Sequence, residues 1–169
     1  MGKPQEKINH AEQNAQAWAE SIAEMVAALE CDYDRLEELR DMAGDRDTIL
    51  DQDEADELKE LTEAATLEGD LQESAENVRE RIQGSPLSVQ VRSGWRSPGD
   101  DHGDPEEFEI LLSTGGPALR IRGELGEHNQ PSRAWLEYRD WGTPWTEYHG
   151  EELAHSDLMT FCQQFYFGE

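Results

Sequence analysis

The chain has 169 residues, 36% of them hydrophobic, and its 39 acidic and 14 basic side chains give a formal net charge of −25. Such a chain repels the phosphates of a nucleic acid, so we expect no direct nucleic-acid binding, and an anionic membrane surface is disfavoured for the same reason. No apolar run approaches the roughly 18 to 20 residues that a membrane-spanning helix needs, and the first ten residues contain no apolar leader segment. We therefore expect a soluble, cytoplasmic protein.

Residues 5–43 are predicted to be helical. Their apolar side chains recur at alternating spacings of three and four, as at the a and d positions of a heptad repeat. The stripe breaks at Asp32 and resumes with Leu36 and Leu39. It can pair with another helix of the same chain, as a helical hairpin, or with a second copy in a homodimer. The side chains expected to carry this pairing are Ile8, Trp18, Ile22, Met25 and Leu29.

Two further helices are predicted before residue 85. The first covers residues 51–67, where the apolar positions are Ala55, Leu58, Leu61 and Ala65. The second is expected to begin at Asp70, whose side chain would cap the first turn while Glu73 reaches back in a capping box. Residues 1–84 are thus predicted to form an acidic helical region of two or three antiparallel helices.

From Leu87 onward the apolar residues alternate with polar ones, which is typical of strands. Residues 107–125 form a predicted hairpin around Gly115 and Gly116. Further strands are predicted at residues 87–91 and 133–139, with a short edge strand near Thr146. Residues 151–167 are predicted to form a helix that covers the sheet. The expected fold class is α+β: a coiled-coil-like N-terminal helical hairpin or bundle, then an antiparallel sheet of about four strands with a C-terminal helix. The two expected domains are 1–84 and 85–169.

Several runs of the sequence resemble a known group of proteins. They are ALECDYDRLEELRD, LSVQVRSGWRSPGD, EFEILLSTGGPALRIRGEL, SRAWLEYRDWGTPWTEY and TFCQQFYFGE. Together they resemble a family of short acidic proteins carried on plasmids and integrative elements of proteobacteria. The resemblance implies a context and no particular activity. Small acidic cargo genes of mobile elements often serve anti-defence roles, which favours an inhibitor.

The acidic residues are most concentrated between Glu30 and Glu60, where 14 acidic side chains meet 4 basic ones. Carboxylates displayed along helices can imitate the phosphates of a duplex and occupy a basic groove, with fast and salt-sensitive association. The first hypothesis is therefore a non-catalytic acidic protein that binds and inhibits a DNA- or RNA-handling protein. The alternative for these acids is a solvated face that keeps the protein soluble. The partner-binding residues expected are Glu37, Glu38, Asp41, Asp45, Asp53, Asp56 and Glu57.

A structural or adaptor module is the second hypothesis. The heptad helix would then pair with a second copy or a partner, and the sheet would present aromatic side chains, which often anchor interfaces. We expect Trp135 or Trp141 to be buried and Trp95 and Trp145 to form an exposed patch.

No motif of a catalytic, metal or cofactor site is recognisable, so we expect none of the three. The aspartates that begin at Asp51 do not match a calcium-binding loop, whose glycine and terminal glutamate are missing. Cys31 and Cys162 lie far apart and give no metal-ligand spacing. A third hypothesis, a small enzyme, would need a pocket built on His102, His149 or Cys162.

Overall fold

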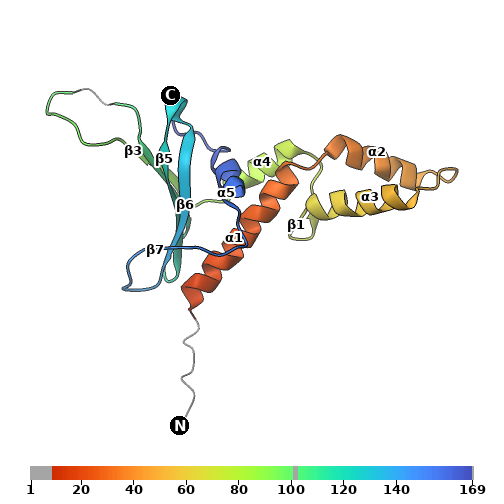
Figure 1. Cartoon of the computed structure of the whole chain (residues 1–169), viewed down its shortest axis with the longest axis horizontal. Coiled ribbons are helices and arrows are strands. Elements are labelled where there is room, and N and C mark those ends of the chain that lie inside the picture. The colour runs from red at the N-terminus through yellow and green to blue at the C-terminus, as the bar shows by residue number, and fades with distance from the viewer. Residues whose placement is uncertain (1–8, 101–102, 169) are drawn as a thin grey trace, which may run out of the picture.

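The computed structural model describes residues 9–100 and 103–168, so Ile8, His102 and the predictions made for them lie outside the described residues. An antiparallel sheet forms one layer, and helices α1 (His10–Leu29), α4 (Ala75–Gly84) and α5 (His155–Cys162) lie on one side of it (Figure 1). The hairpin formed by α2 (Tyr33–Gly44) and α3 (Gln52–Ala64) projects away from these two layers. The predicted α+β class is confirmed.

The sheet contains five strands in chain order: β3 (Ser88–Arg92), β4 (Glu107–Ser113), β5 (Ala118–Leu125), β6 (Pro131–Arg139) and β7 (Thr146–Glu147). Each strand pairs antiparallel with the next. The predicted count of about four strands was too low. The short edge strand expected near Thr146 is present as β7, whose Glu147 and Thr146 pair with Glu137 and Tyr138.

The central hairpin β4–β5 confirms the alternation read from the sequence. Along β4, Phe108, Ile110 and Leu112 are buried, while the residues between them are half-exposed on the other face. The turn uses both glycines. Gly115 has a φ of 102°, which a residue with a side chain rarely adopts, and Gly116 lies so close to Trp141 that a Cβ would approach the ring to 1.9 Å.

The helix starts follow from side-chain caps. The Asp32 carboxylate accepts a hydrogen bond from the Arg35 amide at 3.0 Å, so α2 begins there as a separate helix. Asp51 and Glu54 form a complete capping box at the start of α3. The break in the heptad stripe at Asp32 is therefore the boundary between two helices.

The predicted capping box at Asp70 was wrong. Asp70–Leu71 form strand β2, which pairs with β1 (Thr66–Leu67) in a two-stranded ribbon. Glu68 and Gly69, with φ values of 50° and 86°, turn the chain back between them, so Asp70 lies in extended backbone. Helix α4 starts after Ser74, whose hydroxyl accepts from the Asn77 amide at 3.2 Å.

One continuous core joins the helices to the sheet. On α1 its members are Ala15, Ala19, Ile22, Met25, Val26 and Ala28. They share a cluster with Phe108 and Ile121 of the sheet and with Phe161 of α5. The predicted boundary between residues 84 and 85 therefore falls within a single core. The predicted pairing residues Ile22 and Met25 are covered by their own chain, and Trp18 and Leu29 pack half-buried against it.

Replacing Ile22 with alanine should destabilise the whole fold. Ile22 is fully buried, and truncation of a buried isoleucine costs about 2–5 kcal/mol. Ile49→Ala is the matched control, because Ile49 is 93% exposed and its loss should change stability by less than about 0.5 kcal/mol. Urea unfolding followed by both helix and tryptophan signals measures the two variants. Two separate transitions in Ile22→Ala, with the sheet unaffected, would contradict the single core.

Candidate functional site

The α2–α3 hairpin is the most distinctive surface of the molecule. Leu36 and Leu39 of α2 are buried, but α3 has no buried residue. The hairpin is anchored at its base, where the Tyr33 hydroxyl donates to the Ala28 carbonyl at 2.8 Å and the Cys31 Sγ lies 3.6 Å from the Leu61 carbonyl. Figure 1 shows it extending beyond the end of α1, away from the sheet. Both helices therefore present most of their surface to solvent.

The structure places all seven predicted acidic residues on this hairpin. Glu57 is half-exposed, and the other six are exposed. Arg35 binds two of them, with its Nη1 2.7 Å from the Glu38 carboxylate and its Nη2 2.9 Å from that of Glu57. The hydrogen bonds that Arg35 donates to Glu57, and next in size the one to Glu38, raise the pKa of Arg35. Arg35 thus compensates part of the negative charge of these two carboxylates.

Two more of the seven have local structural roles. Asp45 accepts hydrogen bonds from the Thr48 hydroxyl at 2.8 Å and from the Asp47 amide at 3.2 Å, which lower the pKa of its carboxyl. Asp56 accepts from the Gln52 side chain at 3.0 Å. The remaining three have no ion pair or side-chain hydrogen bond with any residue that the structure describes. They are Glu37, Asp41 and Asp53.

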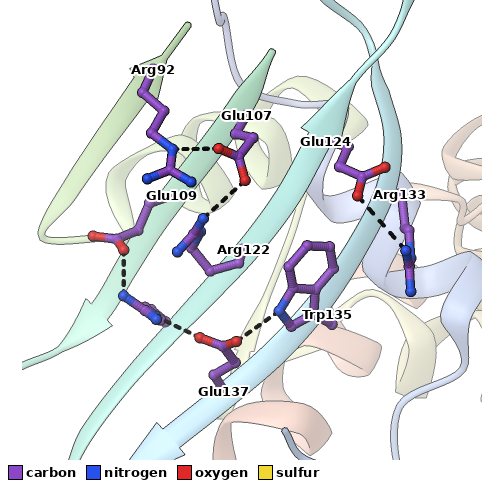
Figure 2. A network of polar contacts seen from close by, with 9 residues as sticks. Arg92, Glu107, Glu109, Arg122, Glu124, Arg133, Trp135 and Glu137 are labelled. Atoms are coloured by element: carbon purple, nitrogen blue, oxygen red, sulfur yellow. Dashed lines mark hydrogen bonds and ion pairs between the residues drawn. The ribbon is translucent and has the colours of Figure 1, made fainter. Parts of the chain in front are cut away.

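The open face of the sheet is charged in a different way, as Figure 2 shows. Arg120 lies between two carboxylates, with its Nη1 2.8 Å from Glu109 and its Nε 2.7 Å from Glu137. The indole Nε1 of Trp135 donates to Glu137 at 2.8 Å. In a second group of contacts Glu107 binds both Arg92 and Arg122, and the Arg122 Nη2 lies 3.2 Å from the Glu107 carboxylate. A separate ion pair joins Arg133 to Glu124. Acids and bases alternate across this face and compensate one another.

The predicted aromatic patch does not form as one surface. Trp95 is fully exposed in the loop after β3. Trp145 is half-buried beneath two guanidinium groups, at 4.0 Å from Arg120 and 4.5 Å from Arg139. The strand register puts these two loops at opposite ends of the sheet (Figure 1). The expectation that Trp135 or Trp141 is buried was wrong: Trp135 is half-buried on the open face and Trp141 is 78% exposed.

An open pocket of about 890 Å³ lies between the start of α1 and the segment around β7. Tyr138 and Tyr148, whose ring centroids are 6.4 Å apart, line it, and Glu12, Glu147 and Glu152 are among its other residues. Burial, and to a smaller extent the hydrogen bond that its hydroxyl donates to Glu152, raises the pKa of Tyr148 above the ordinary value of a phenol. Sequence reasoning missed this pocket, because its residues come from segments more than a hundred positions apart.

The residues of the enzyme hypothesis are not brought together among the described residues. Cys162 is fully buried in the core, and this burial raises the pKa of its thiol. His149 is exposed, with its Nδ1 3.9 Å from Glu147, and His102 lies outside the described residues. Within residues 9–100 and 103–168, no group of three or more His, Cys, Asp and Glu side chains is placed to hold a metal ion.

None of the helices in the described part of the chain is long and apolar enough to cross a membrane. Comparisons of the chain with protein families, with curated proteins and with solved structures found no match. The functional interpretation therefore rests on the surfaces described above.

The pair between Arg92 and Glu107 should give a pH-dependent contribution to stability. The hydrogen bond from Arg92 is the main cause that lowers the pKa of Glu107 in the folded protein. The pair therefore stabilises the fold above pH about 4.3, the pKa of a glutamate in the unfolded chain. This stabilisation is lost as the pH falls through the lower pKa that Glu107 has in the folded protein. Arg92→Gln should be less stable than the wild type at pH 7 and equally stable once Glu107 is protonated. Urea titrations at pH 7 and at pH 2–3 measure the difference; a deficit that persists unchanged in acid would contradict it.

The two thiols should differ in reactivity. Burial raises the pKa of both thiols, but Cys162 is fully buried, whereas Cys31 is half-exposed and accessible to a reagent. In native protein a chromogenic disulfide reagent should modify Cys31 and leave Cys162 intact, so that a Cys31→Ser variant gives almost no signal until denaturant is added. Rapid modification of native Cys31→Ser would mean that Cys162 is accessible and would revive the enzyme hypothesis.

Proposed function

We propose that this protein is a non-catalytic acidic binding protein whose α2–α3 hairpin docks on the basic surface of a nucleic-acid-handling protein, in place of the nucleic acid. The observation that carries the proposal is the projecting hairpin itself. Between residues 30 and 60 it holds 14 acidic and 4 basic side chains, and Glu37, Asp41 and Asp53 have no cation beside them among the described residues.

The contrast with the sheet supports this proposal. On the open face of the sheet Glu107, Glu109 and Glu137 each lie beside an arginine, so these charges serve the fold. On the hairpin most acids face water, and their mutual repulsion works against compact structure. A basic groove would relieve this repulsion on docking. Association of this kind is steered by charge and weakens as salt is added.

Apolar side chains on the hairpin would supply the short-range part of the contact. Ile49, in the connection between α2 and α3, is 93% exposed, and Leu58 and Leu61 on α3 are half-exposed. Charge gives fast encounter, while buried apolar contacts slow dissociation. Ile49 lies among the acids at the tip, where it would enter a partner's groove with them.

The resemblance to acidic proteins of mobile elements supplies a class of partner. We propose a defence protein that acts on DNA or RNA, which an acidic inhibitor would block by occupying its nucleic-acid site. The adaptor alternative, with α1 as the pairing element, is not proposed, because Ile22 and Met25 of that helix are buried within their own chain. The remaining alternative is that the hairpin acids only keep the protein soluble.

Affinity capture tests the proposal. The immobilised protein is exposed to a proteobacterial lysate and eluted in salt steps, with and without competing duplex DNA, and each captured protein is then assayed for nucleic-acid binding in the presence of the free protein. The proposal expects a nucleic-acid-binding protein that moderate salt or DNA releases and that the free protein inhibits. Capture that resists salt and ignores DNA, or no specific capture, would overturn it.

A matched pair of charge variants separates docking from net charge. Glu37→Gln, Asp41→Asn and Asp53→Asn together remove three hairpin charges, whereas Glu80→Gln, Glu127→Gln and Glu151→Gln remove three exposed charges from the rest of the molecule. The hairpin triple variant should bind the captured protein at least about 10-fold more weakly, since each lost interfacial charge contact is worth roughly 0.5–1 kcal/mol. The control should bind almost as well as the wild type. Equal losses in the two triple variants, measured by calorimetric titration, would show that only overall charge matters.

A further inference from the structure

Strand β3 is a free edge of the sheet. It pairs with β4 on one side, from Ser88 opposite Leu111 to Arg92 opposite Glu107, and no described strand lies on its other side. The pairing is regular over all five residues, without a register shift. A regular edge strand offers a row of unpaired backbone donors and acceptors that can add another strand.

The core side of this edge is apolar and uncovered. Val89 and Val91 lie opposite the buried Ile110 and Phe108, yet they are 37% and 47% exposed. Leu87, just before the strand, is 60% exposed. The core ends at Phe108, on which the ring of Phe167 packs at a centroid distance of 4.5 Å. The apolar face of the sheet thus continues past the helices to the edge strand.

The devices that usually protect an edge strand are absent from β3. In natural proteins, proline, bulges or charged residues within an edge strand prevent it from pairing with another chain. The only charged residue of β3 is Arg92 at its end, and its side chain is held along the sheet by Glu107. Residues 81–99 contain no acid, the longest such stretch in a chain with 39 acidic residues. The edge is therefore the region where a strongly acidic molecule repels a second copy least.

We propose that β3 pairs antiparallel with β3 of a second copy, so that two five-stranded sheets join into one continuous sheet across a two-fold axis. With the axis at Gln90, Val89 faces Val91 of the second copy, and Arg92 faces Ser88 of the second copy. The apolar residues of both copies then form one strip on the helix side. The two Arg92 residues are four positions apart along the paired strands, roughly 13 Å, so they do not oppose each other.

Salt should strengthen this dimer. Each copy carries a net charge of −25, so repulsion between copies works against pairing at low ionic strength and is screened as salt is added. The proposed docking of the hairpin on a basic partner responds to salt in the opposite direction. The two proposals use different surfaces, and each can fail without the other.

Sedimentation velocity over a concentration series, at 50 and 500 mM NaCl, tests the dimer. The wild type should shift from monomer to dimer as concentration rises, and more readily at high salt. Val91→Lys should raise the dissociation constant at least 10-fold, because it places a charge in the apolar strip. Ile49→Lys is the control with an equally drastic change at an exposed isoleucine of the hairpin, and it should dimerise like the wild type. A wild type that stays monomeric throughout, or a dimer that Val91→Lys leaves unchanged, would overturn the proposal.

Cross-linking tests the register, in a Cys31→Ser background that removes the half-exposed native thiol. Gln90→Cys puts two cysteines directly opposite each other across the two-fold axis, whereas Ser88→Cys puts each opposite an arginine. Mild oxidation should link Gln90→Cys into a covalent dimer at least 10-fold faster than Ser88→Cys. Equal rates for the two variants, or no cross-linking of Gln90→Cys, would overturn the proposed pairing.

Discussion

The packing of α1 on the sheet is the interaction on which the rest of the structure depends. The strands bury one face, with Phe108, Ile110 and Ile121 at its centre, and that face must be covered to be stable. The small side chains of Ala15 and Ala19 let the α1 backbone approach the strands closely. Burial of apolar surface contributes about 25 cal/mol per Å², so this helix and α5 beside it supply much of the stabilisation.

Because α1 and α4 both contact this core, the chain between them is free to leave it. In the α2–α3 hairpin Leu36 and Leu39 are buried on α2, α3 has no buried residue, and many of the exposed positions carry charge. The charged residues of this hairpin can therefore be changed without loss of the core. The same separation explains why several of its acids have no ion pair, while Glu109 and Glu137 of the sheet are held by Arg120 (Figure 2).

Two surfaces of different electrostatic character follow from this arrangement, one acidic and one apolar. The hairpin concentrates negative charge and would bind a basic partner, with an affinity that falls as salt rises. The β3 edge is free of acids and presents Val89 and Val91, so its association would depend on apolar burial and backbone pairing. Since they lie in different parts of the molecule (Figure 1), a dimer through β3 and a docked hairpin are compatible.

The sequence by itself determined the local elements: the alternation around Gly115 and Gly116, the break in the helical stripe at Asp32, and the concentration of acids between residues 30 and 60. These depend on neighbours within a few residues, where side-chain periodicity and capping act. Only the tertiary structure decided what the α1 stripe covers, because an apolar stripe fits a sheet as well as another helix. It also decided the turn at Glu68 and Gly69, the exposure of each tryptophan, and the bare edge at β3, since each of these depends on residues far apart in the chain.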